Sequence, residues 1–199
     1  GVAGPALHIA AAFPSVSLDG VTISPAQVDL AAARIAAAGL QDRVRVQLGD
    51  YHDLPFPDHA FDVVLFLESC EYALDRDRVF REVRRVLVPG GRVYVKGALR
   101  REGPLTLQQQ IDLDAYNALW ALRSTPSPSE VVAALVAAGF IGVTSAPLAL
   151  GSAHFLGSMF ALGPQGLRPN AFGQAMFRRF VDLPVGFAEV AGRTPERSD

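Results

Sequence analysis

Three short stretches decide the fold of this chain: GDY at 49–51, FDVV at 61–64 and LVPGGRV at 87–93. The first follows a short strand-like run, the second opens a near-continuous apolar run, and the third ends an amphipathic helix in a glycine turn. This order of strand, strand, helix, turn and strand predicts an α/β fold with a parallel sheet covered by helices. Sheets of this kind hold ligands at the carboxyl ends of their strands.

The other elements follow from periodicity and capping residues. Strands are expected at 16–23, 44–48, 61–67, 93–96, 141–146 and 184–193, and helices at 25–38, 77–87 and 128–139, the last after the capping box SPSE at 127–130. The regular alternation breaks over 98–125, where 105–120 predicts a helical insertion. The arginines of the helix at 77–87 are interpreted as a solvated face: Arg78, Arg81, Arg84 and Arg85.

Composition narrows the class of protein. A chain of 199 residues that is half apolar can bury one core, so residues 1–199 are expected to form a single domain. The net charge of -2 gives no electrostatic reason to invoke nucleic acid or an anionic membrane. A single cysteine, Cys70, suits a reducing cytoplasm, and a homo-oligomer stays open. One lysine among many arginines suggests a GC-rich bacterial gene.

The FDVV stretch and the later LxPGG turn resemble the second half of class I S-adenosylmethionine-dependent methyltransferases, over about residues 1–97. The resemblance implies a Rossmann-like, doubly wound, mostly parallel sheet, with S-adenosylmethionine as cofactor and 98–125 as a helical cover over the acceptor. In the family a strand and an acidic-x-Gly-x segment come before the point that corresponds to Gly1, so an N-terminal part is expected to be missing. Ala3 stands where a third glycine is common.

The resemblance also assigns cofactor contacts near the start of the chain. The backbone of Gly1–Gly4, and Gly1 in particular, is expected close to the methionyl part of the cofactor, where a side chain would collide. Many relatives hold the ribose with an acid where this chain has Thr22. Together with Ile23, Ser24 and Gln27, it is similar to the Ile-Ser-x-x-Gln pattern of some relatives. Alternatively, Ser24 only caps the next helix and Gln27 is only solvated.

Three further cofactor contacts are predicted at strand ends. Asp50 comes directly after the strand at 44–48, where the family's acid accepts a proton from the adenine amino group, and Tyr51 would contact the base. The alternative is that Asp50 only caps a turn. Leu67, which ends the apolar strand, is the last predicted contact with the cofactor.

The segment LESCEY at 67–72 is expected to face the cofactor sulfur. Relatives that methylate hydroxyls often have Glu-Ser-Leu-His-His here, but this chain has Glu71 and Tyr72 in place of the histidines. The spacing from Glu68 to Tyr72 is instead similar to prenyl diphosphate C-methyltransferases, where a carboxylate can stabilise and then deprotonate a carbocation. Glu68 and Tyr72 are therefore the candidate catalytic residues, with Tyr116 or Trp120 as further aromatic partners of the cation. The alternative makes Glu68 a structural carboxylate.

The four histidines, His8, His52, His59 and His154, lack the spacing of metal ligands, so no tightly bound metal is expected. A magnesium ion held on a diphosphate would leave no such pattern, and His154 could serve as a base in O-methylation. The favoured function is methyl transfer to a small-molecule natural product, with C-methylation of an isoprenoid or alkene ahead of O-methylation. A cofactor-binding relative without methyl transfer and a non-catalytic nucleotide-binding scaffold are the alternatives.

Overall fold

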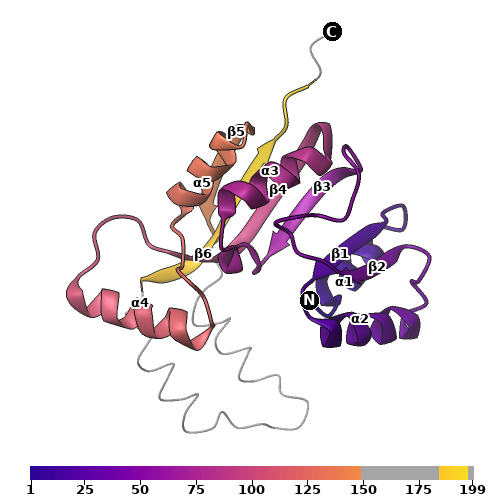
Figure 1. Ribbon diagram of the computed structural model, residues 1–199, viewed down its shortest axis with the longest axis horizontal. Coiled ribbons are helices and arrows are strands. Elements are labelled where there is room, and N and C mark those ends of the chain that lie inside the picture. The colour runs from indigo at the N-terminus through magenta and orange to yellow at the C-terminus, as the bar shows by residue number, and fades with distance from the viewer. Residues whose placement is uncertain (149–183, 197–199) are drawn as a thin grey trace, which may run out of the picture. The chain divides into compact units, whose positions relative to one another are not determined.

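The computed structural model describes residues 1–148 and 184–196 (Figure 1). The chain divides into two compact units, Gly1–Pro57 and Asp58–Asp199, and each is described here by itself. None of the helices in these described ranges has the length and apolarity that crossing a membrane requires.

The first unit alternates helices and strands: α1 at Gly4–Ala12, β1 at Leu18–Thr22, α2 at Pro25–Ala37 and β2 at Val44–Leu48. Strand β1 pairs with β2 in parallel, and the register places Thr22 opposite Leu48. A proline lies in the first turn of each helix, where its missing N–H costs no intrahelical bond. A small core lies between the helices and the sheet, made of Ala3, Ala10, Ala31, Ile35 and Val44.

The second unit carries a four-stranded sheet with the order β3-β4-β6-β5. Its elements are β3 at Phe61–Leu67, η1 at Cys70–Tyr72, α3 at Arg76–Val86, β4 at Leu87–Arg100, α4 at Leu107–Leu119, α5 at Pro128–Ala137, β5 at Ile141–Pro147 and β6 at Val185–Arg193. Strands β3 and β4 are parallel, whereas β6 runs antiparallel to both β4 and β5. Helices α3 and α5 pack against each other on one face of this sheet (Figure 1).

Helix α3 shows why the sequence pattern predicts the core. Val79, Phe80, Val83 and Val86 are each fully buried, as their spacing along one helix face requires. Two of the arginines on its outer face also make polar contacts. Arg84 donates to the carbonyl of Gly139 at 2.9 Å, and Arg85 pairs with Glu82 and with Asp58 in the preceding loop.

Strand β4 is longer than its sequence predicts. A strand is expected at 93–96, but β4 runs from Leu87 to Arg100. Strand β6 supplies partners for residues 92–100 of this strand, from Arg92 opposite Arg193 to Arg100 opposite Val185. A strand extended by a partner about 90 residues later in the chain leaves no signal in its own periodicity.

Candidate functional site

Four of the predicted cofactor residues lie at the carboxyl end of β1. The hydroxyl of Thr22 donates to Oε1 of Gln27 at 2.6 Å and accepts a hydrogen bond from the backbone N–H of Ser24 at 3.3 Å. Ser24 caps α2 by accepting from the N–H of Gln27 at 3.4 Å, while Ile23 is 77 % exposed. Gln27 is therefore held beside Thr22 rather than merely solvated, and its Nε2 amide takes no part in that bond.

Asp50 lies at the same edge of the first unit's sheet, because β1 and β2 run in parallel and Thr22 is opposite Leu48. Its Oδ1 accepts from the N–H of His52 at 2.9 Å and lies 2.6 Å from the His52 ring nitrogen Nδ1. The ring of Tyr51 lies 5.0 Å from that of His52. Asp50 thus stabilises its own turn, yet 57 % of its side chain stays exposed at the strand end. Sequence reasoning missed the pairing with His52, which the D-x-H spacing could have indicated.

The start of the chain shows which residue carries the unusual backbone. Ala3 has φ of 63° at the N-cap of α1 and is buried in the small core. That left-handed conformation favours glycine, which explains why a glycine would suit this position. Added Cβ atoms at Gly1 and Gly4 would meet no atom within 4 Å. The described residues therefore leave the Cβ positions of Gly1 and Gly4 open.

These groups fit the chemistry of the implied cofactor. A ribose diol and an adenine amino group need paired polar partners. A hydroxyl, a side-chain amide and an exposed carboxylate, from Thr22, Gln27 and Asp50, lie at one edge of a parallel sheet. That edge, at the carboxyl ends of the strands, is where such sheets bind ligands.

In the second unit, Leu67 ends β3 and Glu68 follows with a left-handed φ of 56°. Such a conformation is strained for a residue other than glycine and is typical of functional turns. The Glu68 carboxylate forms an ion pair with Lys96, and half of the side chain is exposed. The Lys96 ammonium also lies 4.6 Å from the centre of the Phe187 ring. The proposed catalytic carboxylate therefore has a cationic partner already in place.

Glu71 is the buried acid of this region, and sequence reasoning gave it no role. It is 4 % exposed, and its Oε1 accepts from the N–H of Ala98 at 2.7 Å. Its Oε2 is buried and has no hydrogen-bond partner among the described residues. Burial raises the pKa of the Glu71 carboxyl above its ordinary value. Gly97 is required beside it, because an added Cβ would lie 2.7 Å from the Glu71 Cδ.

Aromatic groups complete the surroundings of these acids. Tyr72 is 47 % exposed, and the ring of Tyr116 on α4 lies 6.4 Å from that of Trp120. Burial raises the pKa of Tyr116 to about 12, with further contributions from the charges near it, Glu71 first, then Tyr72 and Glu68. The predicted helical insertion therefore brings an aromatic residue into the field of the acids that follow β3.

Other predicted features have simple outcomes. Cys70 is buried, and this burial raises the pKa of its thiol to about 12, as expected of a packing residue rather than a nucleophile. Across the described ranges, no three His, Cys, Asp or Glu side chains are grouped so that they could hold a metal ion. His154 lies outside the described residues, as does 149–183, most of the second segment that could cover an acceptor.

The first half of the chain is similar to known methyltransferases. Residues 1–95 match the model of the methyltransferase domain family. The chain is 35 % identical over 102 residues to ajmaline N-methyltransferase of Rauvolfia serpentina, and 40 % identical over 104 residues to 27-O-demethylrifamycin SV methyltransferase of Amycolatopsis mediterranei (strain S699). The segment 1–95 is therefore a methyltransferase domain, and these similarities support the class I S-adenosylmethionine-dependent family that the sequence motifs predict.

These alignments leave parts of both sequences uncovered. They include 51 % and 52 % of this chain, but only 35 % and 38 % of the two relatives. The chain therefore spans little more than a third of each curated relative. In three dimensions, it is similar to geranyl diphosphate C-methyltransferase of Streptomyces coelicolor A3(2), with a TM-score of 0.78 and 21 % identity, covering 97 % of this chain and 67 % of the other. This similarity confirms the Rossmann-like α/β fold.

Proposed function

We propose that this chain binds S-adenosylmethionine and transfers its methyl group to a small-molecule acceptor. The observation that carries the proposal is the position of Thr22, Gln27 and Asp50 within the segment that matches the methyltransferase domain. These polar groups lie at the carboxyl ends of two parallel strands, where a nucleoside would find both donors and acceptors.

Each cofactor contact then has a role. Thr22 and Gln27 bind the ribose hydroxyls, and Ile23 and Ser24 form the end of the strand beside them. Asp50 accepts a hydrogen bond from the adenine amino group. Tyr51 contacts the adenine base. Gly1 leaves room for the methionyl part, since its own Cβ position is open, and Leu67 contacts the cofactor from the end of β3. The bound cofactor supplies an electrophilic methyl group on a sulfonium. The protein contributes mainly alignment of the two reactants.

For the reaction type, we favour C-methylation of an isoprenoid or alkene. Methyl addition to an alkene leaves a carbocation, which a carboxylate can stabilise and then deprotonate. Glu68 is the proposed acid, Tyr72 presents an aromatic face, and Tyr116 lies in the field of the same acids. The similarity in fold to geranyl diphosphate C-methyltransferase agrees with this choice.

O-methylation of a natural product is the second candidate. The observation in its favour is the 40 % identity to 27-O-demethylrifamycin SV methyltransferase. The ion pair between Glu68 and Lys96 also agrees with it, since it gives the carboxylate a structural role and O-methylation needs no counter-charge for a carbocation.

The test is cofactor binding followed by turnover. Calorimetry with S-adenosylmethionine measures binding, and release of S-adenosylhomocysteine is then measured with geranyl diphosphate and with a phenolic acceptor. Binding with turnover of geranyl diphosphate supports the proposal, and turnover of the phenol alone selects O-methylation. Binding without turnover selects a relative that has lost methyl transfer. Absence of binding overturns the proposal.

A further inference from the structure

A polar pocket lies in the unit Asp58–Asp199, apart from the acids that follow β3. Its volume is about 470 Å³. It is bounded by the start of α3, the end of β4 with the loop after it, one face of α4, the segment between α4 and α5, and the start of α5. The residues of α4 in its lining are Gln110, Leu113, Asp114 and Asn117, whose spacing places them on one helix face. Glu68, Glu71, Tyr72 and Tyr116 are not among the lining residues.

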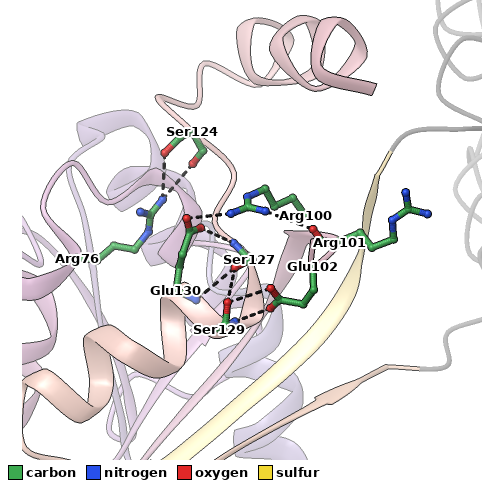
Figure 2. Close-up of polar contacts among 8 residues, drawn as sticks. All are labelled: Arg76, Arg100, Arg101, Glu102, Ser124, Ser127, Ser129 and Glu130. Carbon is green, nitrogen blue, oxygen red and sulfur yellow. Dashed lines mark hydrogen bonds and ion pairs between the residues drawn. The ribbon is translucent and has the colours of Figure 1, made fainter. Parts of the chain in front are cut away.

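Three arginines from three different segments line this pocket: Arg76, Arg100 and Arg123. Arg76 begins α3 and donates from its terminal nitrogen to the carbonyl of Ser124 at 3.1 Å, which fixes its direction (Figure 2). Its Nε is buried and has no hydrogen-bond partner among the described residues. Arg123 is exposed and has no hydrogen bond or ion pair to any described residue. The pocket thus holds one preoriented guanidinium and one without a counter-charge.

The acids near the arginines are already engaged. Glu130 pairs with Arg100 at 3.0 Å and accepts from the N–H of Ser127 at 2.7 Å as part of the capping box of α5. Asp114 accepts from the amide of Gln110 at 2.9 Å. Against these two carboxylates the lining carries three guanidinium groups, which leaves one net positive charge.

Glu102 and Arg101, which are adjacent in sequence to the lining residues, do not alter the net charge of the pocket lining. Glu102 accepts from the N–H and hydroxyl of Ser129 at 2.7 and 2.9 Å, which commits it to the start of α5. Figure 2 shows Arg101 extending away from the group formed by Arg76, Arg100 and Glu130.

The pKa of Glu130 indicates that the electrostatic potential in this region is positive. Burial alone would raise the pKa of its carboxyl, but the Ser127 N–H, Arg100 and Arg76 together bring it below its ordinary value. A positive field that keeps a partly buried acid ionised will also favour a bound anion.

We propose that this pocket binds a phosphate-class anion, either free or carried on a larger molecule. A guanidinium donates two parallel N–H bonds to phosphate oxygens, and its planar fork suits this geometry better than a lysine would. The buried Nε–H of Arg76 would gain the acceptor that it lacks, and Arg123, Gln110 and Asn117 supply further donors around the pocket. Because these donors come from α3, α4 and the segment after α4, a bound anion would tie the α4 segment to the body of the unit.

Calorimetry with pyrophosphate and with inorganic phosphate, in low-salt buffer without cofactor or acceptor, tests the pocket directly. We expect pyrophosphate to bind, and expect Arg76→Gln and Arg123→Gln each to weaken binding about 10- to 100-fold, as for loss of hydrogen bonds to a charged group. Arg81→Gln is the matched control, since Arg81 is exposed on α3 but does not line the pocket. Its affinity should equal that of the unmodified chain.

Arg76→Gln also removes the contact with Ser124, so its thermal unfolding is measured in parallel. Arg123→Gln keeps the test decisive, because Arg123 makes no polar contact with the described residues whose loss could unfold the chain. Absence of pyrophosphate binding, or equal loss of affinity in all three variants, would overturn the proposal.

Two further ligands separate the possible sources of the anion. If geranyl diphosphate and pyrophosphate bind equally, the pocket takes a free anion. If geranyl diphosphate binds more tightly and geraniol does not bind, the anion belongs to a larger, partly apolar ligand. Both outcomes support an anion site, and neither depends on methyl transfer.

Discussion

The polar groups of the first unit and the acids of the second are held in different ways. Thr22, Ser24, Gln27 and Asp50 are fixed by hydrogen bonds to residues two to five positions away in the sequence. Glu68 and Glu71 are fixed instead by Lys96 and Ala98 on the neighbouring strand β4, 28 and 27 residues away. A locally held group tolerates changes elsewhere in the fold, whereas the acids depend on the register of β3 against β4.

The two acids of the second unit also differ from each other in exposure. Glu68 and Glu71 are three residues apart, yet the Glu68 side chain is half exposed and Glu71 is 4 % exposed. The turn through η1 points one acid toward Lys96 and the other beneath β4, against Gly97. The same residue type thus gives an accessible carboxylate paired with Lys96 and a buried one with a raised pKa.

The largest expected effect is on turnover, from Glu68→Gln. The amide keeps the shape but removes the charge and the base that a carbocation needs. Methyl transfer to an alkene should therefore fall about 10²- to 10⁴-fold. Cofactor affinity should change little. Turnover with geranyl diphosphate and calorimetry with S-adenosylmethionine measure the two quantities on the same variant. Near-normal turnover would leave Glu68 as the structural partner of Lys96.

The next effect is on stability, from Gly97→Ala. The added methyl group would press on the buried Glu71 carboxyl and should cost about 1–3 kcal/mol of unfolding free energy, as overpacking does. Gly186→Ala on the paired strand β6 is the control, because a Cβ there meets nothing within 4 Å. Urea unfolding of both variants measures the difference. Equal stability of the two variants would show that the Glu71 side chain can move aside. The acids held by β4 would then be less rigid than the structure indicates.

Asp50→Ala tests the locally held group. Loss of the proposed hydrogen bond to adenine should weaken binding of S-adenosylmethionine by about 1.5 kcal/mol, or roughly tenfold. Asp42→Ala is the control, an exposed acid in the turn before β2. Calorimetry compares the two variants. If both bind the cofactor like the unmodified chain, the only remaining role of Asp50 is to stabilise the turn that holds His52.

The smallest effect is a change in pH dependence, from Glu71→Gln. Burial raises the pKa of Glu71 in the folded state, so folding favours its protonated form. That contribution is fully present below the unfolded-state pKa of about 4.5 and is lost as pH rises through the higher folded-state pKa. The Gln variant should therefore gain stability relative to the unmodified chain as pH rises from 4 to 8. Urea unfolding of both proteins across this pH range measures the difference in stability. If the difference stays constant with pH, the folded-state pKa of Glu71 is not raised.

Local patterns predicted much of the fold. The strands β2 and β3 begin and end where periodicity places them, and the capping boxes and caps at Ser24 and Ser127 form as expected. Thr22, Gln27 and Asp50 also meet at one sheet edge, because strand ends of a parallel sheet share that edge. Interactions within a few residues of sequence are readable from the sequence, since chain connectivity alone brings them together.

The residues by themselves therefore predicted the family, the α/β class and the position of Thr22, Gln27 and Asp50 at the strand ends. Tertiary structure alone decided that β4 extends over 14 residues, that Glu71 rather than Glu68 is the buried acid, and that Arg76, Arg100 and Arg123 line one pocket. The physical reason is the same in each case. The burial and pairing of a side chain depend on which distant strand or helix packs against it, and no spacing within its own element encodes that partner.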